Sequence, residues 1–163
     1  MEPRLDLLTN EVGAKISKRM FNVSLAIDQS PLPKATQALV MLRASQINGC
    51  GWCVDAHSKE AAAAGETQAR LNLVAAWRHA AVFTEAERAA LALTEEGTRL
   101  ADAAEGVSDE TWAHVRKHYD DDDETAALVS LVAMINATNR LGVILNYQGG
   151  SYQPGQFDAA LSD

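Results

Sequence analysis

The residues best suited to chemistry are two cysteines and a histidine, spaced Cys50-x-x-Cys53-x-x-x-His57, in a chain with no other cysteine. A helix turns about 100° per residue, so these side chains would share one narrow helical face. Asn48-Gly49 favours a helix break, which places Cys50 in a first turn, where free N–H groups stabilise a thiolate. His57, one turn beyond Cys53, can accept its proton. The spacing predicts a redox dithiol with its own base.

Three other interpretations of the cysteine pair stay open at this point. A structural zinc site also favours Cys-x-x-Cys with a nearby histidine, but a closed site needs four ligands and no further cysteine exists. A structural disulfide across so short a loop would remove little entropy from the unfolded chain. The thiols could also be packed as small apolar side chains, with His57 a satisfied core residue. The histidine on the same face favours the redox interpretation over this last one.

Composition limits the partners and the architecture. The 163 residues suffice for a single domain, residues 1–163, with a sizeable core. The formal charge of −8 argues against a nucleic-acid backbone or an anionic membrane as partner. The chain starts with no basic segment followed by an apolar one, and its longest nearly apolar stretch, residues 126–135, is too short to span a bilayer. We therefore expect a cytoplasmic protein, where a catalytic dithiol is more common than a permanent disulfide.

The elements that must position the dithiol are expected to be helices throughout, because no segment shows sustained period-two alternation. The sequence predicts an all-α, oligomeric bundle of about six to eight helices. The last helix is apolar almost all round in its first half, so it must be central or covered by another subunit. Residues 147–163 are expected to form an arm over the domain surface or a neighbour. The predicted helices cover residues 5–27, 34–47, 50–65, 67–81, 84–104, a segment from 108, and 125–146.

Two further clusters could bind a metal, but neither is expected to. His114 and His118 are four residues apart, a spacing that can hold a metal, yet no third ligand lies in register. The acidic residues 120–124 suit a solvated helix entrance and lack the turn pattern of a calcium loop. We therefore predict no metal and no cofactor.

Beyond these patterns, residues 42–61 (LRASQINGCGWCVDAHSKEA) resemble the core motif of the alkylhydroperoxidase D branch of the carboxymuconolactone decarboxylase family. Residues 83–91 (FTEAERAAL) resemble the helix that follows in that family, and residues 136–140 (NATNR) match more loosely. The resemblance covers residues 34–140, and we take residues 34–104 as the core motif region.

The resemblance implies an all-helical subunit that forms trimers or hexamers, with the dithiol near subunit contacts. It implies reduction of hydroperoxides, or of a partner peroxiredoxin's disulfide, with electrons returned through lipoyl or thioredoxin-like thiols. By similarity, Cys53 becomes a sulfenic acid, Cys50 closes the disulfide and His57 relays the proton. The helix-dipole argument alone makes Cys50 the more acidic thiol, so the order of the two cysteines stays open.

The chain departs from the family pattern at two places. The family's relay includes a glutamate on the preceding helix, and the matching position is Ala38, flanked by Gln37, which cannot take a proton. The histidine that some members place between the cysteines is Trp52, a large apolar side chain. A carboxylate from elsewhere could substitute for the glutamate, and the sequence does not choose among Asp55, Glu60 and Glu11.

Four functions are compatible with these residues. The leading hypothesis is a thiol-dependent hydroperoxide reductase. The second is a thiol–disulfide relay for a protein partner with weak activity toward free peroxide, which the missing glutamate favours. A lactone decarboxylase is a third, although the dithiol counts against it. The fourth is a binding module whose thiols sense oxidation.

Overall fold

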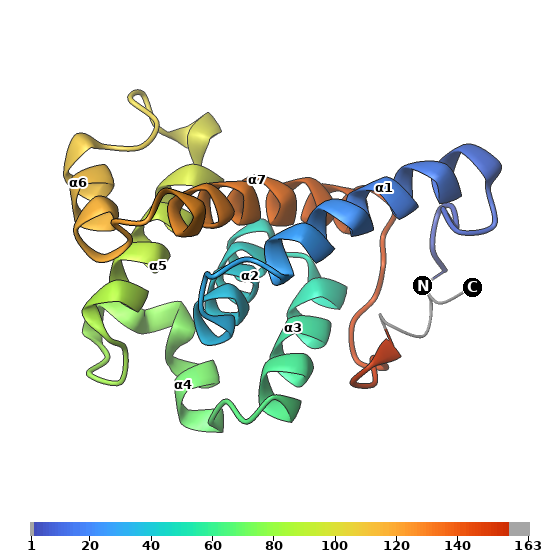
Figure 1. The fold of residues 1–163 in the computed structure, drawn as a ribbon. Helices are drawn as coiled ribbons and strands as arrows, with labels where there is room; N and C mark the ends of the chain where they lie inside the picture. Colours follow the sequence, from blue (N-terminus) through green and yellow to red (C-terminus); the bar gives the residue numbers. More distant parts are fainter. Residues whose placement is uncertain (1, 157–163) are drawn as a thin grey trace.

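The computed structural model describes residues 2–156, and this part of the chain consists of α-helices, two short 3-10 segments and connecting turns, without strands (Figure 1). Its seven α-helices confirm the all-α class. Residues 157–163 of the predicted arm lie outside the described residues. The helices are α1 (Glu11–Asp28), α2 (Lys34–Asn48), α3 (Gly51–Ala63), α4 (Gln68–Leu73), α5 (Glu85–Thr98), α6 (Asp109–His118) and α7 (Asp122–Ile144).

Helix α2 lies at the centre, packed against α7, α5 and α3. It contributes to both apolar clusters of the core. The first cluster joins α2 to α5, α6 and α7, with Val40, Val115 and Leu128 fully buried. The second joins α2 to α3, α4 and α5, with Val74 and Leu91 fully buried. Helix α3, which carries the cysteine motif, is thus held on the central helix by the second cluster.

Helix α7 is longer than the apolar stretch measured in the sequence. It runs for 23 residues, and by length and composition alone it is apolar enough to cross a membrane, with a mean hydropathy of 1.5. It packs against α2, α1 and α5, and it buries Asn136 and Asn139 in hydrogen bonds with side chains of neighbouring helices. These contacts are those of a central bundle helix, as expected, although Val129 and Val143 stay exposed on its outer side.

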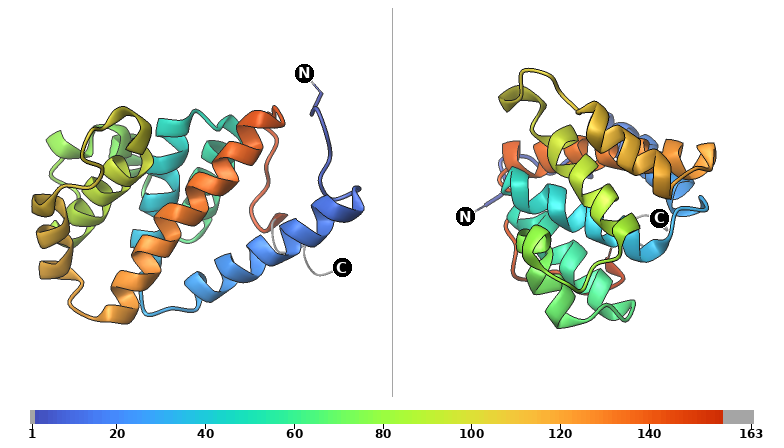
Figure 2. Two further views of the ribbon diagram at one scale, coloured as in Figure 1. Left: turned by 90° about the horizontal axis from the view of Figure 1, so that it is seen from above. Right: turned by 90° about the vertical axis from the view of Figure 1, so that its left-hand side faces the viewer.

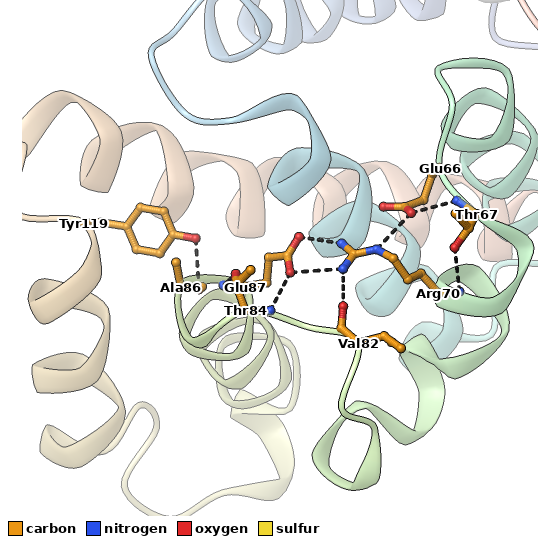
Figure 3. Close-up of polar contacts among 8 residues, drawn as sticks. All are labelled: Glu66, Thr67, Arg70, Val82, Thr84, Ala86, Glu87 and Tyr119. Carbon is orange, nitrogen blue, oxygen red and sulfur yellow. Dashed lines mark hydrogen bonds and ion pairs between the residues drawn. The ribbon is translucent and has the colours of Figure 1, made fainter.

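Several helix ends follow from their capping residues. The hydroxyl of Thr84 accepts from the backbone of Glu87, and the Glu87 carboxylate accepts from the backbone of Thr84, so the predicted capping box is formed. Glu87 also pairs with Arg70 of α4, which donates to Glu66 and to the Val82 carbonyl as well (Figure 3). One guanidinium therefore joins α4 to the start of α5.

Two predicted helices are wrong at their C-terminal ends. The helix over residues 67–81 stops at Leu73 and continues as a 3-10 segment, Val74–His79, in which Ala76 leaves the helical region with φ −118° and ψ 25°. Arg88 donates to the carbonyls of Trp77, Arg78 and Ala80 at the end of this segment. The helix over residues 84–104 stops at Thr98, just after Gly97, and only a 3-10 turn, Leu100–Asp102, follows. Gly97 lowers the helix propensity in the last turn of the second of these helices.

Helix α1 begins six residues later than predicted from residue 5, because the side chain of Asn10 accepts from the Gly13 N–H and caps it at Glu11. Figure 2 shows α1 running away from the rest of the bundle toward its N-terminal end. Only Gly13 and Ile27 of α1 are buried, while Val12, Ile16 and Val23 are exposed. The helix therefore presents apolar side chains that the described residues do not cover.

Candidate redox site

The turn between α2 and α3 places the two cysteines. Gly49 ends α2 with a φ of 66°, a left-handed conformation that favours glycine, and the Cys50 N–H then donates back to the Ser45 carbonyl at 3.1 Å. The side chain of Asn48 donates to Asn136 and Asn139 of α7 at 2.9 and 3.0 Å. This buried amide network fixes the end of α2, and with it the start of α3, against α7.

Cys50 and Cys53 form a disulfide in the structure, with their Cα atoms 5.3 Å apart. Cys50 is the N-cap of α3 and not part of its first turn, and its sulfur accepts from the Cys53 N–H at 3.4 Å. Both residues are buried, with 1% and 3% of their surface exposed. The sequence analysis predicted the pairing, and the N-cap position supplies the N–H group that would stabilise a thiolate on Cys50.

Gly142 of α7 leaves the space that the two sulfurs occupy. A Cβ at this position would lie 2.7 Å from the Cys50 sulfur and 3.4 Å from the Cys53 sulfur. Any larger residue would collide with the disulfide, so α7 can approach α3 this closely only with glycine here. The glycine sits one turn after Asn139, whose amide donates to the hydroxyl of Ser45 at 3.0 Å.

His57 lies in α3 one turn beyond Cys53, as predicted, because the helix is continuous from Gly51 to Ala63. The ring keeps some accessible surface, but protein atoms surround it closely, and burial lowers the pKa of His57 to about 4. The negative charge of Glu60 raises that pKa in part. At neutral pH the imidazole is therefore uncharged.

The C-terminal segment 147–156, here called the arm, lies on α3. The Asp55 carboxylate accepts from the N–H groups of Gly150 and Tyr152, at 2.7 and 3.0 Å, and Lys59 donates to the Tyr152 carbonyl at 2.9 Å. Tyr152 is 1% exposed. Hydrogen bonds from Lys59 and from the arm lower the pKa of Asp55, so this carboxylate stays ionised and holds the arm.

The arm also builds an aromatic cluster beside the dithiol. The ring of Trp52, between the two cysteines, meets Tyr147 and Tyr152 edge to face, with centroids 6.2 and 5.8 Å apart. Gly149 packs so closely on α3 that a Cβ there would lie 2.4 Å from the Gly51 carbonyl oxygen. The arm therefore covers the N-terminal turn of α3, on the domain's own surface.

The position of the missing glutamate and the three carboxylates considered as its replacements lie in different places. Ala38 packs on the second apolar cluster, and Gln37 is buried one residue away, donating to the Leu32 carbonyl at 2.9 Å, so neither supplies an acid. Glu11 pairs with Lys15 on the exposed side of α1. Asp55 holds the arm and Lys59. Glu60 accepts hydrogen bonds from the Tyr152 hydroxyl and the Gly155 N–H.

Within residues 2–156, the dithiol coincides neither with a metal cluster nor with the cavities beside the 3-10 segment Val74–His79. Among residues 2–156, no group of three or more histidine, cysteine, aspartate or glutamate side chains could hold a metal ion. His114 and His118 stack edge to face, with ring centroids 5.0 Å apart. A cavity of about 420 Å³ lies between the 3-10 segment and α5, lined by Arg78, His79 and Arg88 among others, and no dithiol residue borders it.

Sequence reasoning missed three parts of this site. It assigned no role to Gly142, to the amide network of Asn48 and α7, or to Tyr152. A glycine inside an apolar helix, three residues after a buried Asn, was the available signal for the first two. The sequence predicted an arm but gave no signal for its contacts with α3, because these hydrogen bonds join residues more than 90 positions apart.

Comparison with known proteins identifies the family of this chain. The model of the carboxymuconolactone decarboxylase family matches residues 14–96. This match begins before the resemblance noted in the sequence, residues 34–140, and also ends before it. The uncharacterized protein YdfG of Bacillus subtilis is 32% identical over 141 residues, covering 86% of this chain and 94% of the relative.

Solved structures extend the comparison. A protein of unknown function from Agrobacterium tumefaciens, with a suggested role in antioxidant defence of the AhpD type, is 30% identical, with a TM-score of 0.85 over 93% of this chain and 100% of that one. An uncharacterized peroxidase-related protein from Ralstonia eutropha, described as an alkylhydroperoxidase AhpD core, is 16% identical and shares the fold, with a TM-score of 0.71 over 88% of this chain and 74% of that one. The chain belongs to the carboxymuconolactone decarboxylase family, in its alkylhydroperoxidase D-like branch.

Proposed function

We propose that this protein is a thiol-dependent hydroperoxide reductase that cycles between a Cys50/Cys53 dithiol and the disulfide. The observation that carries the proposal is the Cys50–Cys53 pair at the start of α3, with His57 one turn beyond. The names of the solved relatives, peroxidase-related and AhpD-like, support the same chemistry.

The proposed cycle begins with the reduced protein. His57 takes the proton of the Cys53 thiol, and the thiolate attacks the outer oxygen of the hydroperoxide. The S–O bond forms as the O–O bond breaks, and the leaving alkoxide takes the proton from His57 to become an alcohol. The Cys50 thiolate, stabilised by the Cys53 N–H, then attacks the Cys53 sulfenic acid, which closes the disulfide and releases water once the hydroxide is protonated.

Completing the cycle takes two electrons and two protons from an external dithiol. The proposed donors are lipoyl or thioredoxin-like thiols. The disulfide of a partner peroxiredoxin is proposed as an alternative substrate of the reduced dithiol. The proposed location is a reducing compartment such as the cytoplasm. We also propose a homo-oligomer, a trimer or hexamer, in which a neighbour covers the exposed apolar side chains Val12, Ile16 and Val23 of α1. No metal, cofactor, nucleic acid or membrane enters the proposal.

A second candidate is a thiol–disulfide relay for a protein partner. The observation that favours it is Ala38, an apolar residue in the second cluster where the family's relay has a glutamate. Second-order rate constants for oxidation of the reduced protein by tert-butyl hydroperoxide and by a disulfide substrate such as oxidised lipoamide separate the two functions. The reductase requires faster oxidation by the hydroperoxide, whereas a clear preference for the disulfide would assign the relay.

A further inference from the structure

One carboxylate is held next to His57 by the arm. Glu60 follows His57 by three residues in α3, and side chains three apart on a helix are neighbours. Its Oε1 accepts from the hydroxyl of Tyr152 and, at 2.7 Å, from the N–H of Gly155. Tyr152 is itself buried against Trp52, so the carboxylate has a fixed place.

We propose that Glu60, fixed by Tyr152 of the arm, is the positioning carboxylate of the dithiol site, in a chain that has Ala38 where the family's relay has a glutamate. This inference rests on the proposed function. It makes the arm, and not only α2 and α3, part of the reactive site.

The proposed role is electrostatic. When the proton of Cys53 moves to His57, a neutral pair becomes a thiolate and an imidazolium, and the negative carboxylate beside the imidazolium favours this charged form. Glu60 lies seven residues from Cys53, so it attracts the imidazolium more than it repels the thiolate. Glu60 itself neither gains nor loses a proton in the cycle.

No other described charge is placed to do the same. Among the charges of residues 2–156, the carboxylate of Glu60 is the one that acts on the pKa of His57, and it raises that pKa. Asp55 and Lys59 lie two residues to either side of His57, which turns them to other faces of α3, and they pair with each other. The arginines of the helices packed on α3 are engaged elsewhere: Arg43 with Glu95, Arg70 with Glu66 and Glu87, and Arg140 with Asn136.

The test uses a Glu60→Gln substitution in a Cys50→Ser background, so that Cys53 is the one remaining thiol. Glutamine keeps an oxygen that can accept from Tyr152 and Gly155 but carries no charge. We expect the rate of Cys53 alkylation by iodoacetamide to fall by about 3- to 10-fold at pH 6–7 and to match the Cys50→Ser parent at pH 9–10, where the thiolate forms without help.

Asp55→Asn in the same background is the matched control, because it removes one charge on the same helix while the asparagine oxygen can still accept from the N–H groups of Gly150 and Tyr152 and so keep the arm in place. It should leave the pH profile of alkylation within about two-fold of the parent. The proposal is overturned if the pH profile of Cys53 alkylation in Glu60→Gln equals that of the parent. It is also overturned if the alkylation rate falls by the same factor at every pH, or if it falls as much in Asp55→Asn.

These outcomes are separate from failure of the proposed function. Alkylation of Cys53 reports the thiolate without any peroxide. If wild-type protein is not oxidised by peroxide but Glu60→Gln shifts the profile, the function is wrong and the electrostatic role of Glu60 stands. If peroxide oxidises the wild type but Glu60→Gln changes nothing, the reductase stands and the role of Glu60 is refuted.

Discussion

Replacing Gly142 with alanine should destabilise the oxidised protein relative to the reduced one. The added methyl would lie 2.7 Å from the Cys50 sulfur, well inside the roughly 3.5 Å at which non-bonded contacts begin. The disulfide bond holds this sulfur in place, so overpacking costs about 1–3 kcal/mol in the oxidised state. In the reduced state the thiol can rotate away, and only the helix-propensity gain of alanine, about 0.5–1 kcal/mol, remains.

The difference between the two states raises the reduction potential of the dithiol. At about 30 mV for each 1.4 kcal/mol, a cost of 1–3 kcal/mol corresponds to a potential about 20–65 mV less negative. The potential is measured by equilibration with reduced and oxidised dithiothreitol, and stability by urea unfolding with and without reductant.

Gly97→Ala is the control for this prediction. A Cβ at Gly97 would meet Val132 Cγ1 at 2.9 Å, far along α7 from the sulfurs, so its effect should not depend on the redox state. Equal changes of the free energy of unfolding in oxidised and reduced Gly142→Ala, with an unchanged potential, would refute the close contact between α7 and the disulfide.

Three further predictions follow from the site. In Cys50→Ser, one equivalent of hydroperoxide should leave a sulfenic acid on Cys53, detected by dimedone labelling and peptide mapping. If a sulfenic acid forms efficiently on Cys50 in Cys53→Ser instead, Cys50 is the residue that the hydroperoxide oxidises first. Because burial lowers the pKa of His57 to about 4, the unfolded chain binds a proton that the folded chain does not between pH 6.5 and 4, so the free energy of unfolding should fall by up to about 3 kcal/mol as the pH drops through this window. His57→Gln should flatten that dependence in urea titrations, and an unchanged slope would contradict it. Gly149→Ala, whose Cβ would press on the Gly51 carbonyl oxygen, should lift the arm and speed reduction of the disulfide by dithiothreitol several-fold; a rate equal to that of the wild type would show that the arm does not limit access.

The parts of the fold that sequence predicted are those set by local chemistry. Gly49 ends a helix because it can adopt a positive φ, and Thr84 begins one because its hydroxyl reaches the Glu87 N–H. The change to a 3-10 segment after Leu73 was missed because no glycine or proline marks it, and the hydrogen bonds at the end of that segment come from Arg88, further along the chain.

The candidate site divides in the same way. The spacing of Cys50, Cys53 and His57 identified a paired dithiol and a nearby imidazole, and the structure holds that pair as a disulfide. The choice among Asp55, Glu60 and Glu11 needed the fold, because only the position of the arm and the course of α1 separate them. Gly142 meets the sulfurs across about 90 positions of sequence, a contact that no local pattern encodes.

The most direct test of the dithiol mechanism is mass spectrometry of the fully reduced protein after one equivalent of tert-butyl hydroperoxide. The mechanism predicts the loss of two hydrogens within the mixing time of a quench experiment, with the disulfide mapped to Cys50 and Cys53. A protein that keeps both thiols under these conditions would contradict it.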